Sequence, residues 1–268
     1  MEGPLTAAYP RIALVTGADS GIGAATARLL ADEGFDIGIT YHSDAAGADD
    51  TRIEVERRGQ RCEVIQQDVA DLASDDAVGE LIGRHGGIGV LVNNAGTGSS
   101  GAVLDTDLQT WRTVVATDLD GAFVCARRAG RTMVEQGQGG RIIFVTSVHE
   151  HVPRRGAAAY CAAKAGLGMF AKVLALELAD HGITVNSVAP GEVATEMTGQ
   201  AEADAWHIRR PGNPLGHPGH VVEIASVIGF LASPRASYVT GSSYAVDGGL
   251  MLMAAHGHDN AGDDWRDP

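Results

Sequence analysis

The chain alternates between short apolar runs and longer segments in which apolar and polar positions mix. Continuous apolar runs of this kind are typical of strands covered on both faces, as in a parallel sheet. We predict seven strands, at residues 12–16, 36–41, 62–66, 88–93, 141–147, 183–189 and 242–246. Helices are predicted between them, including residues 22–33, 45–58, 75–85 and 108–135. This alternation indicates an α/β fold, a doubly wound parallel sheet with helices on both faces.

One predicted helix, at residues 159–179, is apolar on nearly all sides. Its charged residues are Lys164, Lys172 and Glu177. Such a helix must be buried on more than one side, and the sheet covers only one. We expect the same helix of a second copy to cover the other side about a two-fold axis, which predicts a homo-oligomer. The alternative is a helix covered by loops of its own chain.

Two segments depart from the alternation. Residues 192–218 form a long polar stretch that contains Pro211, Pro214 and Pro218, and we interpret it as a lid over the substrate. Residues 254–268 form a polar, acidic tail. Because no internal repeat or linker divides the rest, we expect a single domain over residues 1–268.

Composition and charge narrow the classes of function. Of the 268 residues, 44% are hydrophobic, enough for a substantial core. Acidic residues outnumber basic ones by 34 to 20, and this formal net charge of −14 argues against nucleic-acid and anionic-membrane partners. We expect no apolar run to reach the length of a membrane span, and the start of the chain lacks the pattern of a signal peptide. The three cysteines form no CxxC pair, so we predict reduced thiols and a cytoplasmic location.

Glycines gather where the first predicted strand meets the first predicted helix, in TGADSGIG at residues 16–23. Glycine permits positive φ, and a helix N-terminus offers free N–H groups to a pyrophosphate. The spacing matches neither the GxGxxG fingerprint nor a P-loop. The turn indicates a phosphate cradle, with an ordinary tight turn as the alternative.

Candidate acid/base chemistry lies further along the chain. Ser147 ends the fifth predicted strand, and Tyr160 and Lys164 follow on the apolar helix. Tyr160 and Lys164 are four residues apart and therefore share one helical face. A nearby ammonium favours the phenolate and brings a phenol toward the range of an acid/base catalyst. The alternative is a core tyrosine beside a lysine that extends to solvent.

These motifs together resemble those of the short-chain dehydrogenase/reductase family, and the resemblance covers nearly the whole chain. The matching motifs, in order, are the TGxxxGxG turn at Thr16–Gly23, Asp68-Val69, Asn93-Asn94-Ala95-Gly96, Ser147 with Tyr160 and Lys164, Asn186 with Pro190-Gly191, and Gly241 with Val246-Asp247-Gly248-Gly249. Most of these residues lie at or just beyond the carboxyl end of a predicted strand, at the sheet edge where α/β folds bind ligands.

The resemblance implies a Rossmann-type seven-stranded sheet, a nicotinamide cofactor and reversible hydride transfer between a carbonyl and an alcohol. It also implies a tetramer or a dimer joined partly through the helix that carries Tyr160 and Lys164. It makes Tyr160 the general acid/base, Ser147 the hydrogen-bond partner of the substrate oxygen, and Lys164 the group that tunes Tyr160 and holds the nicotinamide ribose. Besides Tyr160 and Lys164, it places cofactor contacts on Gly17, Asp19, Ser20, Gly21, Ile22, Gly23, Tyr41, His42, Ser43, Asp68, Val69, Asn94, Ala95, Gly96, Pro190, Gly191, Val193 and Thr195. In this set Asp68 and Val69 would contact the adenine, Asn94 the adenosine side and Val193 the carboxamide. No metal is expected.

The chain departs from the family at Asp118, which stands where an asparagine commonly holds the water of a proton relay to the lysine. A carboxylate also accepts a hydrogen bond from water, but it adds charge near Lys164. We expect the relay to work with an altered pH profile.

The choice of cofactor depends on the end of the second predicted strand. Tyr41 stands where an acidic residue would select NAD(H), and no basic residue in the glycine-rich turn selects NADP(H). His42 and Ser43 suit a 2′-phosphate and Asp44 opposes one. NADP(H) is slightly favoured over NAD(H).

The substrate prediction rests on the residues after Ser147. His149, Glu150 and His151 lack a third metal ligand at suitable spacing and are interpreted as polar residues at a cleft rim. His149 or Glu150 could orient a second oxygen of the substrate. We predict a small ketone, diketone or hydroxyketone. The alternatives are a 3-oxoacyl-carrier-protein reductase, for which Arg154, Arg155, Arg209 and Arg210 would form the dock, and a non-catalytic cofactor-binding regulator.

Overall fold

The computed structural model describes residues 9–72, 76–98, 100–200 and 202–255. Its strands form one sheet in the order β3-β2-β1-β4-β5-β6-β7, and every paired neighbour is parallel. The strands are β1 (Ile12–Val15), β2 (Asp36–Tyr41), β3 (Cys62–Gln66), β4 (Val90–Asn93), β5 (Gly140–Val145), β6 (Ile183–Pro190) and β7 (Ser243–Val246). The seven-stranded, Rossmann-like α/β fold is therefore confirmed, with bounds within two residues of the predicted strands.

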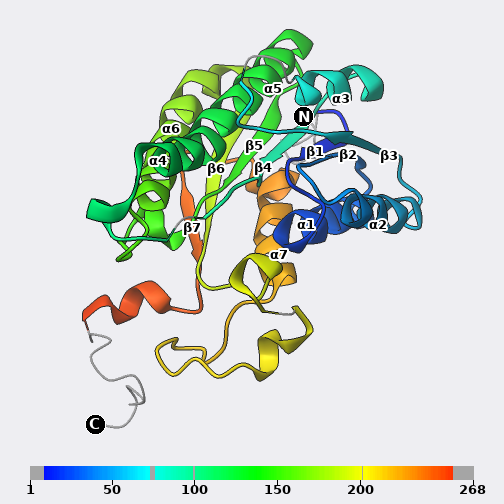
Figure 1. Ribbon diagram of the computed structural model, residues 1–268. Helices are drawn as coiled ribbons and strands as arrows, with labels where there is room; N and C mark the ends of the chain where they lie inside the picture. The colour runs from blue at the N-terminus through cyan, green and yellow to red at the C-terminus, as the bar shows by residue number, and fades with distance from the viewer. Residues whose placement is uncertain (1–8, 73–75, 99, 201, 256–268) are drawn as a thin grey trace.

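Helices cover both faces of the sheet (Figure 1). The α-helices are α1 (Gly21–Asp32), α2 (Ala45–Glu56), α3 (Ala77–His85), α4 (Leu108–Val115), α5 (Ala122–Gln136), α6 (Ala158–Leu178) and α7 (Val221–Ala232). One apolar core lies between the sheet and α1, α2 and α7, and a second lies between the sheet and α3, α5 and α6. Alanines of α1, such as Ala27, are buried in the first core and allow α1 to pack closely on the strands.

The strand order reverses between β1 and β4, which are neighbours in the sheet but not in the sequence. The turn after β1 and the segment after β4 therefore meet at the carboxyl edge of the sheet. In open α/β sheets this switch point is where ligands bind. The topology thus places the glycine-rich turn beside Asn94 and Gly96.

The predicted helix at residues 108–135 is interrupted. The structure has α4, then a π-helical segment, η2 (Ala116–Gly121), and then α5. Gly121 packs so closely on Val69 that a Cβ there would lie 2.4 Å from the Val69 carbonyl oxygen. The wider turn also buries the Asp118 side chain, and such π-bulges are frequent at functional sites. The sequence pattern did not distinguish this segment from ordinary helix.

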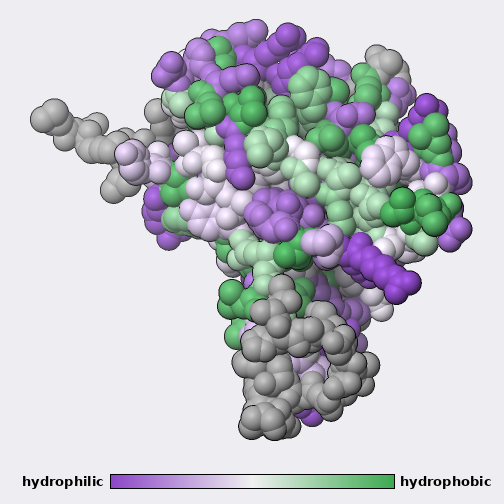
Figure 2. Space-filling model, turned by 90° about the vertical axis from the view of Figure 1, so that its left-hand side faces the viewer, coloured by the Kyte–Doolittle hydropathy of each residue, from purple (hydrophilic) through white to green (hydrophobic). Residues whose placement is uncertain are grey.

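Helix α6 together with the turn that follows it, Ala158–His181, has the length and hydropathy of a membrane-spanning helix, so the expectation that no apolar run is this long was wrong. In the fold its buried residues, among them Ala163, Leu167 and Ala171, face the second core, and it packs on β6. Its other side exposes Met169, Val173 and Leu176, and neighbouring Phe123 and Trp111 are also exposed. Figure 2 shows this side of the molecule, where apolar and weakly polar residues lie between hydrophilic ones.

The predicted lid, residues 192–218, contains two short 3-10 helices, Glu196–Thr198 and Glu202–His207. It lies below the sheet in Figure 1, together with the 3-10 helix Leu250–Ala255. Of the predicted tail, residues 256–268 lie outside the described residues. Helix α7 (Val221–Ala232) follows the predicted lid and is not among the predicted helices.

Candidate active site

The glycine-rich turn has the backbone shape of a phosphate cradle. Gly17 has φ +60° and Gly21 has φ +53°, a region that residues with a side chain rarely adopt. A Cβ on Gly23 would lie 2.2 Å from the Gly17 carbonyl oxygen, and a Cβ on Gly17 would lie 2.9 Å from Ala95 Cα. The glycines therefore bring three pieces of backbone together at the start of α1.

Residues after β4 fix this turn. Thr16 Oγ1 accepts hydrogen bonds from the backbone N–H groups of Asn94 and Ala95, both at 3.0 Å. The side-chain amide of Asn94 donates to the carbonyl oxygens of Thr16 at 3.0 Å and Gly17 at 2.7 Å. Both amide hydrogens of Asn94 are therefore used to hold the turn. A contact between Asn94 and adenosine would have to use the side-chain or backbone oxygen of Asn94, and it stays a prediction.

The N-terminus of α1 fits an anionic ligand. Ser20 is the N-cap residue but makes no side-chain capping bond in the described structure, and the first turn holds no acidic residue. The N–H groups there are free for a phosphate. A pocket of about 440 Å³ opens beside them, lined by Ser20, Gly21, Glu196, Gly199, Gln200 and Glu202. The backbone of the turn therefore suits an anion such as a pyrophosphate, whereas the lid side of the pocket carries the carboxylates of Glu196 and Glu202.

A buried charged pair lies at the carboxyl edge beside Gly96. Lys164 Nζ is 3.3 Å from Asp118 Oδ2, and the two side chains are 5% and 0% exposed. Lys164 Nζ also donates to the Val145 carbonyl oxygen at 3.3 Å and lies 5.5 Å from the ring centroid of Tyr160. Asp118 Oδ1 accepts from the backbone N–H of Thr97 at 2.7 Å. The structure thus brings Asp118, Tyr160 and Lys164 together.

Burial and charge act in opposite directions on this pair. Burial by itself lowers the pKa of Lys164, but the negative charges of the Asp118 carboxylate and of the phenolate form of Tyr160 outweigh it, and the pKa of Lys164 is raised. Burial raises the pKa of Asp118, against the opposing effects of Lys164 and the Thr97 N–H. Asp118 therefore helps to keep Lys164 protonated in an environment that disfavours its charge.

Ser147 lies two residues after β5 and is the N-cap of a 3-10 turn, η3 (Val148–Glu150), where its Oγ accepts the His149 N–H at 3.1 Å. This turn packs on α6, the helix that carries Tyr160 and Lys164. The hydroxyl of Ser147 can still donate its proton. Its predicted bond to a substrate oxygen therefore remains compatible with the structure.

The residues after β2 are exposed. His42 and Ser43 are open to solvent, and His42 Nε2 lies 4.0 Å from Asp68 Oδ2. Asp44 caps α2, and its Oδ1 accepts the Gly47 N–H at 3.0 Å. The carboxylate of Asp44 is thus directed at a helix N-terminus, which offsets part of its charge.

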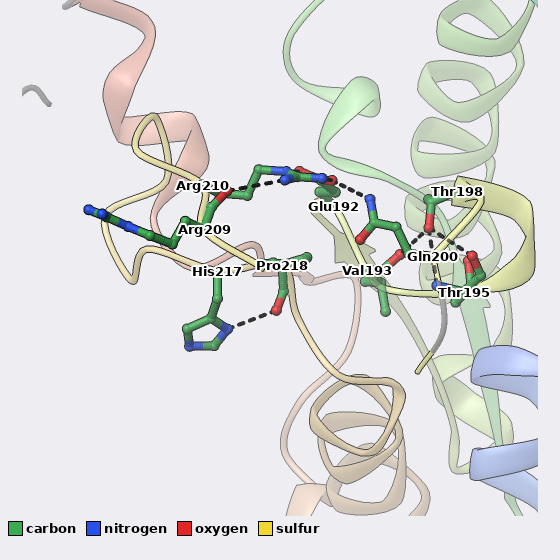
Figure 3. A network of polar contacts seen from close by, with 9 residues as sticks. All are labelled: Glu192, Val193, Thr195, Thr198, Gln200, Arg209, Arg210, His217 and Pro218. Atoms are coloured by element: carbon green, nitrogen blue, oxygen red, sulfur yellow. Dashed lines mark hydrogen bonds and ion pairs between the residues drawn. The ribbon is translucent and has the colours of Figure 1, made fainter. Parts of the chain in front are cut away.

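The lid is held by contacts that the sequence analysis did not predict (Figure 3). The single Nε–H of Arg210 is shared between the two carboxylate oxygens of Glu192, at N···O distances of 2.9 and 2.8 Å, and Gln200 Nε2 donates to Glu192 at 2.7 Å. Thr198 Oγ1 donates to the carbonyl oxygen of Val193 at 2.8 Å. These partners are up to 18 residues apart, so no local sequence pattern reveals them.

The lid also reaches the glycine-rich turn. A Cβ on Gly21 would come 3.4 Å from Thr195 Cγ2. Gly191, just before the lid, donates its N–H to the carbonyl oxygen of Val246 at 3.0 Å and lies against Asp247. The predicted cofactor residues after β6 are thereby placed between the cradle and β7.

The side chains of the three polar residues after Ser147 and Val148 have partners within the protein and do not converge on one point. Glu150 Oε1 lies 3.0 Å from His151 Nε2, and His149 Nδ1 lies 3.1 Å from the carbonyl oxygen of Val152. In the part of the chain that the structure describes, no group of three or more His, Cys, Asp or Glu side chains could hold a metal ion.

Comparisons with known proteins agree with this geometry. A family model described as Enoyl-(Acyl carrier protein) reductase matches residues 17–251. The chain is 50% identical over 243 residues to "Uncharacterized oxidoreductase YohF" of Escherichia coli (strain K12), which covers 90% of this chain and 96% of that protein. It is 38% identical over 251 residues to a 3-oxoacyl-[acyl-carrier-protein] reductase of Synechocystis sp., covering 93% of this chain and 100% of that protein. Among solved structures, the acetoin dehydrogenase from Enterobacter cloacae is 49% identical, with a TM-score of 0.85 over 90% of this chain and 95% of that one.

Proposed function

Because the chain belongs to the short-chain dehydrogenase/reductase family of oxidoreductases, we propose that it interconverts a small ketone, diketone or hydroxyketone with the corresponding secondary alcohol. The observation that supports this most directly is the buried pair of Lys164 and Asp118 beside Tyr160, next to Gly96 and the phosphate cradle. A chain that only bound a cofactor would have no need for a buried lysine beside a phenol.

In this proposal each side chain has a separate task. When bound, a nicotinamide cofactor supplies the hydride that the carbonyl carbon accepts. Tyr160 gives its phenolic proton to the substrate oxygen, and solvent later returns a proton to Tyr160. Ser147 donates a hydrogen bond to the same oxygen. Lys164 holds the nicotinamide ribose and provides the positive charge beside the phenol, and Asp118 positions Lys164.

The names of the relatives support two substrate classes. Two structural neighbours are described as acetoin dehydrogenases, and acetoin is a small hydroxyketone. A 3-oxoacyl-carrier-protein reductase is the second candidate because a relative has that name. An acidic carrier would need a basic surface, yet the net charge is −14 and Arg210 is engaged by Glu192. The small carbonyl compound therefore comes first.

Four further predictions belong to this proposal. NADP(H) is slightly favoured over NAD(H), since His42 and Ser43 are exposed for a 2′-phosphate and Asp44 caps α2. The protein forms a homo-oligomer through the exposed apolar side of α6. The cytoplasm is its expected location, and a single domain over residues 1–268 its expected organisation.

The test is the oxidation of NADPH and NADH with a panel of small diketones, hydroxyketones, simple ketones and an acetoacetyl thioester. We expect turnover of the small carbonyl compounds, faster with NADPH. Tyr160→Phe should lower kcat by at least about 100-fold, the usual value of a general acid, while the Kd of the cofactor changes little. Turnover of the thioester alone would instead support the second candidate, and cofactor binding without any turnover would favour the regulator.

A further inference from the structure

The ring of His149 is the neighbour of the Tyr160 ring in the candidate active site. The two rings meet edge-on, with centroids 6.2 Å apart and planes at 75°. His149 lies two residues after Ser147, in the 3-10 turn that packs on α6, and is half-buried. Its imidazole therefore stands beside the two groups that are proposed to hold the reacting oxygen.

The hydrogen bond made by the Nδ1 atom of this imidazole determines the tautomer of the ring. Nδ1 of His149 lies 3.1 Å from the carbonyl oxygen of Val152. A carbonyl oxygen only accepts, so Nδ1 must carry the hydrogen. In the neutral imidazole Nε2 then has a lone pair and no hydrogen. Among the described residues, no hydrogen-bond partner of this Nε2 is found.

The side chains of Glu150 and His151, which follow His149, pair with each other, and the second carboxylate oxygen of Glu150, Oε2, is buried without a partner. Glu150 is 3% exposed at its side chain. It faces α6, where a Cβ on Gly168 would meet the Glu150 carboxyl carbon at 3.0 Å. His151 Nε2 also lies 3.2 Å from Ser243 Oγ. His149 is therefore the member of this turn that can accept a hydrogen bond from a ligand.

We propose that His149 Nε2 accepts a hydrogen bond from a hydroxyl group on the carbon next to the reacting carbonyl. The site then favours α-hydroxyketones, and vicinal diols in the reverse direction, over diketones and simple ketones. A diketone offers only lone pairs at this place, and a simple ketone leaves Nε2 without a partner, which costs binding free energy. This inference rests on the proposed reduction of small carbonyl compounds at Tyr160.

The kinetic test compares three substrates of one carbon skeleton: 3-hydroxybutan-2-one, butane-2,3-dione and butan-2-one. His149→Phe keeps an aromatic ring against Tyr160 but removes the acceptor. We expect kcat/KM for the hydroxyketone to fall about tenfold, the usual effect of one lost hydrogen bond, while that for butan-2-one changes by less than about threefold. His151→Phe is the matched control and should leave the ratio of the two substrates unchanged. An equal fall for all three substrates would show that His149 has only a structural role.

A binding experiment separates this inference from the proposed function. Tyr160→Phe with NADPH forms a complex in which the substrate binds without reacting. Calorimetry should show tighter binding of 3-hydroxybutan-2-one than of butan-2-one, and this preference should disappear in Tyr160→Phe/His149→Phe. If wild-type protein turns over none of the three ketones, the proposed function fails. If the double variant keeps the affinity ratio of the single variant, the role of His149 is refuted.

Discussion

At the scale of single residues, Asp118 distinguishes this site from one with a neutral amide at the same place. The carboxylate contacts both Lys164 and the Thr97 N–H in a fully buried position. Two buried charges stabilise a fold only while both are present, because the loss of one leaves the other unpaired. Asp118 departs from the family pattern in the sequence itself, but its direct contact with Lys164 is seen only in the structure.

We predict that Asp118→Asn lowers the free energy of unfolding by about 3 kcal/mol, the lower end of the usual cost of breaking a buried pair. The raised pKa of Lys164 should fall without the carboxylate. Lys164 is then deprotonated at lower pH, so activity should be lost earlier on the alkaline side of the pH–rate profile. Denaturant unfolding and the pH dependence of kcat/KM measure these effects.

Asp120→Asn is the matched control, because Asp120 lies in the same π-helical segment and is only half-buried. It should change neither stability nor the pH profile. An unchanged alkaline limb in Asp118→Asn would contradict the role of Asp118 in keeping Lys164 charged.

At the scale of elements, the lid is connected to the strand edge by one cluster of polar contacts. Glu192 directly follows Gly191 after β6, and Arg210 and Gln200 bring two distant parts of the lid back to it. Thr195 of the same lid lies against Gly21. The pattern of prolines and polar residues predicted a lid, but only the folded chain shows which residues hold it near the phosphate cradle.

We predict that Arg210→Gln raises the KM of the cofactor roughly fivefold, the effect of about 1 kcal/mol from a partly exposed ion pair. The pKa of Glu192 is lowered because its hydrogen bonds with Arg210 and Gln200 outweigh its burial. The ion pair should therefore persist above the usual Glu value of 4.5 and be lost as the pH falls through the lowered pKa.

Arg209→Gln is the control for this variant, since Arg209 is exposed and contributes its backbone carbonyl to Arg210. Steady-state kinetics with varied cofactor should leave its KM unchanged. If both variants behave alike, the Glu192–Arg210 pair does not hold the lid over the cofactor.

At the scale of the whole molecule, the two sides of α6 face different surroundings. One side covers the sheet, and the other exposes Met169, Val173 and Leu176, which are spaced to share one helical face. Exposed apolar faces of this kind mark interaction sites. Because Tyr160 and Lys164 lie on the same helix, an interface there would also support the candidate active site.

We predict that light scattering after gel filtration gives a mass of two or four times 27.7 kDa. Leu176 is 82% exposed, and Leu176→Lys would place a charge in the proposed interface and shift the protein toward smaller species. Leu72→Lys, at an exposed apolar position in the segment after β3 and not on α6, should leave the mass unchanged. A monomeric wild-type protein would contradict the proposed oligomer.

The sequence by itself determined the parallel α/β sheet, because buried strands require continuous apolar runs. It also determined the glycine-rich turn and the shared helical face of Tyr160 and Lys164, because backbone freedom and helical spacing are local properties. Only the tertiary structure determined the π-helical segment around Asp118, the Glu192–Arg210 ion pair and the tautomer of the His149 ring. Each of these depends on contacts between groups that the fold brings together, and burial determines how strongly such contacts act.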